Sequence, residues 1–310
     1  MTAALTGSGA PRLQRNWDTR AACNFIGGGS GTGLLLAAAG AFATGWPYFA
    51  AGILAAALIG FGLSMVWLEI GRPLRALNVF FHPQTSWMSR EAFLAFPVLA
   101  LAGLAVLLDQ PFVRLPLHAH GSVAVLALAA AALGLAFLYC QARILHASRG
   151  VPAWSEPALQ WVIATTAIAE GLGLLLLLSL AVGPPPTWAV AAAIVALAAR
   201  AGTWERYRHR VKLNAPAQAA AVLDRASSSI HLFGNLPVAI LLIGSLTMPS
   251  MIAPAAVAGL LLFATGAYLK FIIVTRAAFT HGFSVPFMPV RGRAGASRRR
   301  AANEERRRCD

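Results

Sequence analysis

Charged side chains are scarce in this sequence. Asp, Glu, Lys and Arg together make up 12% of its 310 residues, whereas 58% of the residues are hydrophobic. Soluble domains carry about 25% charged residues. The composition therefore excludes an ordinary soluble domain and predicts an integral membrane protein.

Cysteine and histidine are also few, which limits the metal chemistry open to the chain. The cysteines Cys23, Cys140 and Cys309 show no C-x-x-C spacing, and iron–sulfur clusters are held by sets of cysteine thiolates. A b-type haem needs two axial ligands on facing helices, and only His146 and His231 fall at the ends of predicted helices. We therefore expect no haem, iron–sulfur cluster or other metal in this chain, with that histidine pair as the one conceivable haem site.

Long apolar runs dominate what is present. A helix needs about 20 apolar residues to span the hydrocarbon core, and helices satisfy their own backbone groups there. Eight windows meet this length, at about 22–43, 48–69, 91–109, 119–143, 158–182, 186–204, 229–248 and 252–275. We predict an all-α integral membrane protein whose eight transmembrane helices form one membrane domain over residues 22–276.

A short internal repeat suggests how the helices are grouped. GSGTGLLL at 29–36 and AEGLGLLL at 169–176 occupy corresponding places in the first and fifth helices. The repeat favours two four-helix bundles of parallel topology, although so short a match of Gly and Leu also arises by chance. The glycine pairs Gly27/Gly31 and Gly29/Gly33 predict close helix packing. A dinucleotide-binding loop is disfavoured because no strand precedes these glycines.

The basic residues are distributed very unevenly. With the termini and the connectors after helices 2, 4 and 6 on one face, 24 of the 25 Lys and Arg residues lie on that face and Arg114 alone lies on the other. The positive-inside rule then places that face in the cytoplasm, in the inner membrane. We expect residues 1–21 to be a retained cytoplasmic segment, and 277–310 to be a disordered basic tail that faces lipid rather than nucleic acid.

One connector gathers an unusual number of polar side chains. The stretch LEIGRPLRALNVFFHPQTSWMSRE, residues 68–91, places Glu69 and Glu91 at the membrane boundary, within reach of Arg72 and Arg90. Ionisable groups at this depth are costly against lipid and are candidates for a functional site. The alternative interpretation is an interfacial salt-bridge cluster that joins helices 2 and 3.

The same residues carry a resemblance. The run LEIGRPLRALNVFFHPQTSWMSREAF resembles the membrane anchor subunits of dimethyl sulfoxide reductase-type complexes and, more broadly, the polysulfide reductase membrane subunit family. Those proteins have an (H/E)-L-G-(R/K)-P motif at the end of helix 2 and T-S-W-(M/L)-(S/T)-R-E at the start of helix 3. The resemblance implies an anchor for a molybdopterin catalytic subunit and a ferredoxin-like iron–sulfur subunit, which exchanges electrons between the nearest cluster and a bound quinone.

The resemblance also implies roles for individual residues. Glu91 matches the helix 3 glutamate linked to quinone binding and protonation, whereas Glu69 stands where dimethyl sulfoxide reductase anchors carry a histidine. Asn24 and Tyr139 match two quinone-site positions of polysulfide reductase-like members, and Gly28 stands where a third position would be histidine. The pocket is therefore expected to differ in detail from that of the relatives.

Quinone chemistry fits these residue types, because quinone reduction takes up two electrons and two protons. The pocket needs hydrogen-bond donors, for which we nominate Asn24, Tyr139 and Arg72, and a proton carrier, for which we nominate Glu69 or Glu91. Three further residues are expected to position the connector at the interface. They are Trp87, Arg90 and His82.

Glu170 is a separate polar position. It lies twelve residues into the fifth predicted helix, about 18 Å from that helix's start at 1.5 Å per residue. Two interpretations are open, a proton path and a protonated carboxyl that bonds to a neighbouring helix. At the ends of helices 7 and 8, His231, Asn235 and Lys270 are expected to serve in docking or helix capping.

The charge distribution also bears on the substrate of the complex. Many relatives hold their catalytic subunits outside the cytoplasm, whereas here the connectors are predicted to be cytoplasmic, which suits a substrate such as a coenzyme A thioester. The N-terminal run NWDTRAACNFIGGGSGTG resembles the membrane subunit of phenylacetyl-CoA:acceptor oxidoreductases. Two other functions stay open from the sequence, a secondary transporter and a purely structural anchor without a quinone site.

Overall fold

The structure is a computed structural model, and it describes residues 10–70, 73–110, 119–247 and 252–281. Its helices are α1 Thr19–Ala43, α2 Phe49–Ile70, α3 Trp87–Leu108, α4 Ala119–Ala147, α5 Pro152–Ser155, α6 Ala158–Val182, α7 Thr187–Asn214, α8 Ala217–Ile230, α9 Leu236–Thr247 and α10 Ile252–Phe271. A 3-10 helix, η1, spans Pro73–Phe81, and π-helices η2 and η3 span His231–Asn235 and Ile272–Arg276. The described part has no β-structure beyond an isolated bridge between Leu13 and Phe279.

Within this described part, eight helical spans are long and apolar enough to cross a membrane. They follow the eight predicted windows in order, so the prediction of an all-α integral membrane protein is confirmed. Of the predicted end segments 1–21 and 277–310, residues 1–9 and 282–310 lie outside the described residues.

One predicted connector is wrong. The sixth span does not end at 204, because α7 continues to Asn214, and α8, η2 and α9 form a continuous helix from 217 to 247. The charged residues in this stretch lower its hydropathy without interrupting the helices. Asp224 on α8 pairs with Arg208 and Lys212 on α7, at 2.7 and 3.1 Å. The two helices therefore continue as a paired hairpin beyond their apolar parts.

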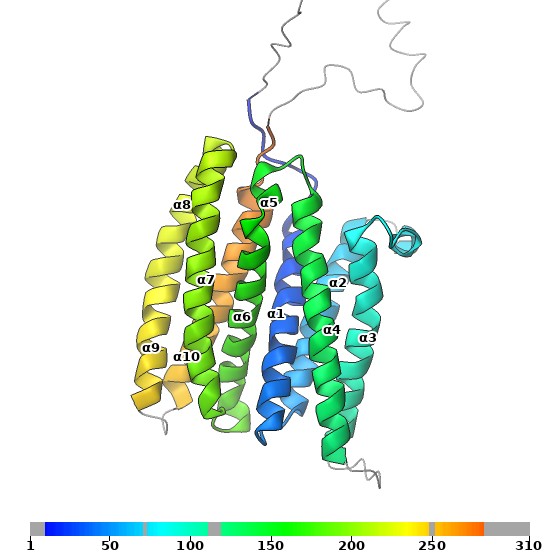
Figure 1. Cartoon of the computed structure of the whole chain (residues 1–310), viewed down its shortest axis with the longest axis vertical. Coiled ribbons are helices and arrows are strands. Elements are labelled where there is room, and N and C mark those ends of the chain that lie inside the picture. The colour runs from blue at the N-terminus through cyan, green and yellow to red at the C-terminus, as the bar shows by residue number, and fades with distance from the viewer. Residues whose placement is uncertain (1–9, 71–72, 111–118, 248–251, 282–310) are drawn as a thin grey trace, which may run out of the picture.

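The eight spans divide into two halves that stand side by side (Figure 1). Helices α1 to α4 form one half and α6 to α10 the other, and the halves meet mainly where α1 packs on α6. The first helix of each half also contacts the last span of the other half, α1 with α10 and α6 with α4. This reciprocal packing agrees with two four-helix bundles of parallel topology.

Glycines allow α1 to lie close to its neighbours, as the sequence predicted. A side chain at Gly33 would overlap the backbone of Ala167 on α6, and one at Gly171 would overlap the backbone of Gly33. On another face, Gly27 and Gly31 lie against the backbone of α2. Small residues permit this approach in membranes, where burial from water does not drive helix association. As a result α1 is the most buried of the described spans.

Most connecting elements gather at one end of the bundle. The start of α1, η1, α5 and the tip of the α7–α8 hairpin lie at the upper end in Figure 1. We call this end the connector face. At the opposite end the Asp109 carboxylate accepts hydrogen bonds from the backbone N–H groups of Tyr48 and Phe49, at 3.0 and 2.8 Å, and so ties α3 to the start of α2.

The α1–α6 contact predicts the effect of a bulky residue at its centre. Gly33→Leu should force the two helices apart and destabilise the protein by at least about 1–3 kcal/mol, the usual cost of overpacking. The measurement is the melting temperature of the purified protein in detergent. The matched control is Gly103→Leu on α3, where an added Cβ meets no atom within 4 Å. Equal melting temperatures for the two variants would contradict this account of the contact.

Candidate functional site

Glu91 lies in the second turn of α3 and is 4% exposed. The helix begins at Trp87 because Ser86 caps it, with the Ser86 hydroxyl accepting from the backbone N–H of Ser89 at 3.3 Å. This start places the Glu91 carboxyl inside the bundle near the connector face. A carboxyl at the edge of the membrane is therefore turned towards protein rather than lipid.

Two amides from two other helices bind the Glu91 carboxyl. Asn24 Nδ2 on α1 donates to Glu91 Oε1 at 3.3 Å, and Gln141 Nε2 on α4 donates to the same oxygen at 3.0 Å. Gln141 Nε2 also donates to the backbone carbonyl of Asn24 at 3.2 Å. Three helices thus converge on one carboxyl. We call Asn24, Glu91 and Gln141 the carboxyl–amide cluster.

Gln141 was not predicted to belong to the site. Its amide occupies the space beside Gly28, where any Cβ would overlap the amide nitrogen. The glycine at 28, a position where the resemblance implied histidine, therefore makes room for the glutamine. The sequence held a signal that was missed, since Gln141 is the only amide side chain in the predicted helix 119–143.

The cluster keeps unused hydrogen-bonding capacity. Asn24 Oδ1 and Gln141 Oε1 are buried and accept no hydrogen bond from the described residues. Buried polar atoms of native proteins normally have a partner. A ligand that brings O–H or N–H groups to this point would supply the missing donors.

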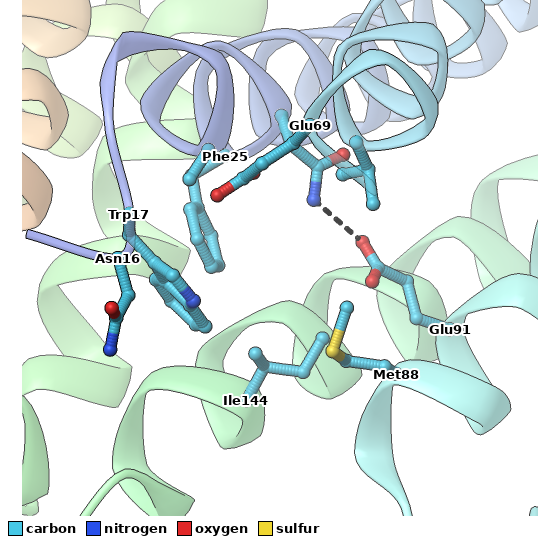
Figure 2. A pocket seen from close by; sticks show the side chains of 10 residues that line it. Asn16, Trp17, Phe25, Glu69, Met88, Glu91 and Ile144 are labelled. Carbon is cyan, nitrogen blue, oxygen red and sulfur yellow. Dashed lines mark hydrogen bonds between the residues drawn. The ribbon is translucent and has the colours of Figure 1, made fainter. Parts of the chain in front are cut away.

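A cavity of about 310 Å³ adjoins the cluster (Figure 2). Its lining residues come from the N-terminal segment and α1 to α4, and they are Asn16, Trp17, Ala21, Asn24, Phe25, Val66, Glu69, Met88, Glu91 and Ile144. Glu69 and Glu91 therefore line one cavity, together with Asn24. Because Asn16 and Trp17 belong to the segment before α1, the cavity lies at the connector face. We call it the head cavity.

Arg90 makes none of the ion pairs that an interfacial salt-bridge cluster would need, in the part of the chain that the structure describes. Its guanidinium donates to the backbone carbonyls of Pro83 and Gln84, at 2.8 and 2.7 Å, and lies over the Trp87 ring at 4.3 Å. Arg90 thus fixes the connector before α3, which is the positioning role also predicted for it. The exposed His82 contributes through its backbone carbonyl, which accepts from the N–H groups of Thr85 and Ser86.

The structure places Tyr139 away from the head cavity. Its side chain is 52% exposed, and its ring forms a T-shaped pair with that of Trp87 at a centroid distance of 5.7 Å. Trp87 therefore lies between Arg90 and Tyr139, joining the connector to α4. Arg72, the other predicted donor, lies outside the described residues.

Arg20 was not predicted to act near the site. It pairs with Asp18 at 2.8 Å and donates to the backbone carbonyl of Leu68 at 3.0 Å. This second bond ties the start of α1 to the last turn of α2, beside Glu69. Arg20 thereby helps to hold the wall of the head cavity that carries Glu69.

Glu170 belongs to a second polar cluster, in the centre of the protein. Its carboxylate Oε2 accepts from Ser30 on α1, at 2.7 Å, and from Lys270 on α10. The side chains of Glu170 and Lys270 are fully buried. Lys270 is therefore not a docking residue, contrary to expectation. The bond from Ser30 is a contact to a neighbouring helix, as in one of the two interpretations of Glu170.

A separate chain of hydrogen bonds begins at Arg200 on α7. Arg200, 1% exposed, donates to Asn235 Oδ1 at 2.9 Å, and Asn235 Nδ2 lies 3.0 Å from His231 Nδ1. His231 Nε2 in turn lies 2.9 Å from Glu205 Oε1. Both ring nitrogens of His231 are thus engaged, and the π-helix η2 directs His231 and Asn235 towards α7. His231 and Asn235 therefore bond to side chains of α7 and to each other, instead of the docking or capping role predicted for them.

Comparison with known proteins agrees with the geometry. The family model described as DMSO reductase anchor subunit (DmsC) matches residues 47–275, from the residues just before α2 into η3. The match includes Glu69, Glu91, Gln141 and Glu170, while α1 with Asn24 precedes it. No curated protein sequence matches the chain. Because the model covers most of the sequence, the chain belongs to the family of DMSO reductase anchor subunits.

Proposed function

We propose that this anchor subunit transfers electrons between an iron–sulfur subunit and a quinone whose head group binds in the head cavity. The observation that carries the proposal is the carboxyl of Glu91, which is buried at the membrane boundary and bound by two amides from two helices. A carboxyl held in this way, beside a cavity, is equipped to bind a polar ligand and exchange a proton with it.

The chemistry of a quinone suits the atoms of the site. A quinone carbonyl needs a donor, and the amide N–H groups of Asn24 and Gln141 are donors. A quinol hydroxyl needs an acceptor, and both amide oxygens together with the Glu91 carboxylate are acceptors. Glu91 would pass a proton to the quinone oxygen as it is reduced, and Glu69, on the same cavity, would exchange protons with the connector face.

The partners follow from the family and from the position of the cavity. We propose that a ferredoxin-like iron–sulfur subunit docks on the connector face, and that a molybdopterin subunit binds through it. A cluster placed there would lie on the side of the membrane where the head cavity is found. The fixed connector formed by Arg90, Trp87 and Tyr139 would give this partner an ordered surface.

We further propose that the connector face is cytoplasmic and that electrons run from an organic substrate to quinone. The basic residues favour this orientation, since those of 206–225 lie on the part of α7 and α8 that leads to the hairpin tip at that face. A cytoplasmic catalytic partner suits a coenzyme A thioester. Phenylacetyl-CoA is the substrate that the N-terminal resemblance favours.

Replacing the titratable carboxyl of Glu91 with an amide tests the proposed site. Glu91→Gln keeps the size and hydrogen bonding of the side chain but removes the titratable group, so quinone reduction by the purified complex should fall about 100-fold or more. Glu205→Gln on α7 serves as the control and should retain activity. Full activity of Glu91→Gln with intact co-purification of the partners would favour a purely structural anchor.

The orientation has its own test. A single cysteine at Gln84, which is exposed in the connector before α3, should resist an impermeant maleimide added to whole cells. A cysteine at Pro184, exposed at the opposite end, should react. Both variants would be made after replacing the native cysteines with serine. Labelling of the Gln84 site from outside would place the connector face, and the catalytic partners, outside the cytoplasm.

For Glu170 we propose a proton path, as a second role separate from the head cavity. Glu170→Gln alone leaves the Lys270 charge buried and unpaired, which is destabilising for its own reasons. The informative variant is therefore Glu170→Gln with Lys270→Met, which removes both charges. A proton path predicts slowed quinone-linked turnover in this folded double variant. Wild-type turnover would leave the pair with a structural role only.

A further inference from the structure

A second cavity, of about 490 Å³, lies between α2, η1 and α3. Its lining is apolar apart from Ser64 and Glu91, and the other lining residues are Gly60, Leu63, Val66, Trp67, Leu77, Val79, Phe80, Met88, Ala92, Ala95, Phe96 and Leu99. We call it the α2–α3 crevice. It shares Val66, Met88 and Glu91 with the head cavity, so these three side chains stand between the two spaces.

The crevice lies on the outer side of the bundle. Among its lining residues, Trp67 on α2 and Phe96 on α3 are 54% and 64% exposed, and because both lie on candidate membrane spans their free surfaces would face lipid. Gly60 on α2 leaves open space, and Ala92 and Ala95 are small residues on α3. The crevice therefore has an apolar lining that is open on the outer side of the bundle, and it adjoins the head cavity across Val66, Met88 and Glu91.

The 3-10 helix η1 covers the crevice on the side of the connector face. Phe80 of η1 packs against Phe93 and Phe96 of α3, at centroid distances of 5.2 and 5.7 Å. Val79 and Leu77 of η1 also line the crevice. An apolar ligand in the crevice would thus be shielded from water at the membrane boundary.

From this arrangement we infer that the α2–α3 crevice holds the isoprenoid tail of the quinone, and that the quinone enters sideways from the bilayer between α2 and α3. The inference rests on the proposed function of the head cavity. The order of polarity supports it: Glu91, bound by two amides, lies on the side that adjoins the head cavity, and the rest of the lining is apolar apart from Ser64. A membrane quinone has a polar head and an apolar tail in the same order.

A phospholipid matches the site less well. Its head group carries a phosphate anion, and an anion beside the Glu91 carboxyl would be disfavoured because like charges repel one another. A quinone head is neutral, and its carbonyl or hydroxyl groups can bond to the amides of the cluster and to their free oxygens. The crevice is thus better matched to a ligand with a neutral polar head.

The test narrows the crevice without touching the carboxyl–amide cluster. Gly60→Phe on α2 adds a ring where a Cβ meets no atom within 4 Å, so the helix packing should be preserved. Gly103→Phe on α3, at an equally open position outside the crevice, is the matched control. The assembled complex in liposomes would be assayed with a long-tailed quinone and with a tail-less quinone of the same head group.

The measured quantity is the ratio of kcat/KM for the long-tailed quinone to that for the tail-less quinone. We expect Gly60→Phe to lower this ratio about tenfold, and Gly103→Phe to leave it at the wild-type value. An unchanged ratio in Gly60→Phe, with an active wild-type complex, would overturn the assignment of the crevice while leaving the head cavity in place. If Glu91→Gln reduced both quinones at the wild-type rate, the proposed head site would fail, and the tail assignment with it.

Discussion

The close packing of α1 against its neighbours is the contact on which the rest of the structure depends. The glycines of this helix admit partners on several sides: Gly33 the backbone of α6, Gly27 and Gly31 the backbone of α2, and Gly28 the amide of Gln141. Gly29, one residue further along, faces the ammonium group of Lys270. Because lipid cannot satisfy polar groups, such side chains are retained only where a neighbouring helix comes near enough to bind them. The glycines of α1 thus determine where buried polar chemistry is possible.

Two polar clusters consequently lie on adjacent faces of the same helix. The carboxyl–amide cluster occupies the first half of the protein at the membrane boundary, beside the head cavity. The Glu170–Lys270 pair occupies the interface between the halves, where Ser30 also reaches it. Among the described residues both clusters keep an unpartnered acceptor, Glu170 Oε1 in the second, but the first also adjoins the head cavity. For that reason we propose the quinone chemistry at the first cluster. A proton path at the second cluster is a separate proposal.

The sequence was sufficient for the features that hydropathy and local motifs determine. Eight apolar runs predicted eight spans, and Glu69 and Glu91 were found to line one cavity. The sequence was insufficient where the partner of a side chain depends on how the helices pack in space. The Arg90 guanidinium donates to backbone carbonyls of its own connector, and Lys270 pairs with Glu170, 100 positions away in the sequence. Hydropathy also placed the end of α7 at 204, ten residues too early. The charged stretch that follows stays helical outside the apolar region because it pairs with α8. The role of Gln141 was missed because it depends on the space that the absence of a side chain at Gly28 leaves for the Gln141 amide.

The most direct test of the central claim is a cryo-electron microscopy map of the assembled complex with a tightly bound quinone-site inhibitor. The account predicts head-group density in the head cavity, within hydrogen-bond distance of Glu91 and of the amides of Asn24 and Gln141. Head-group density elsewhere, for example beside the Glu170–Lys270 pair in the centre of the bundle, with the head cavity filled by lipid or a partner side chain, would contradict it.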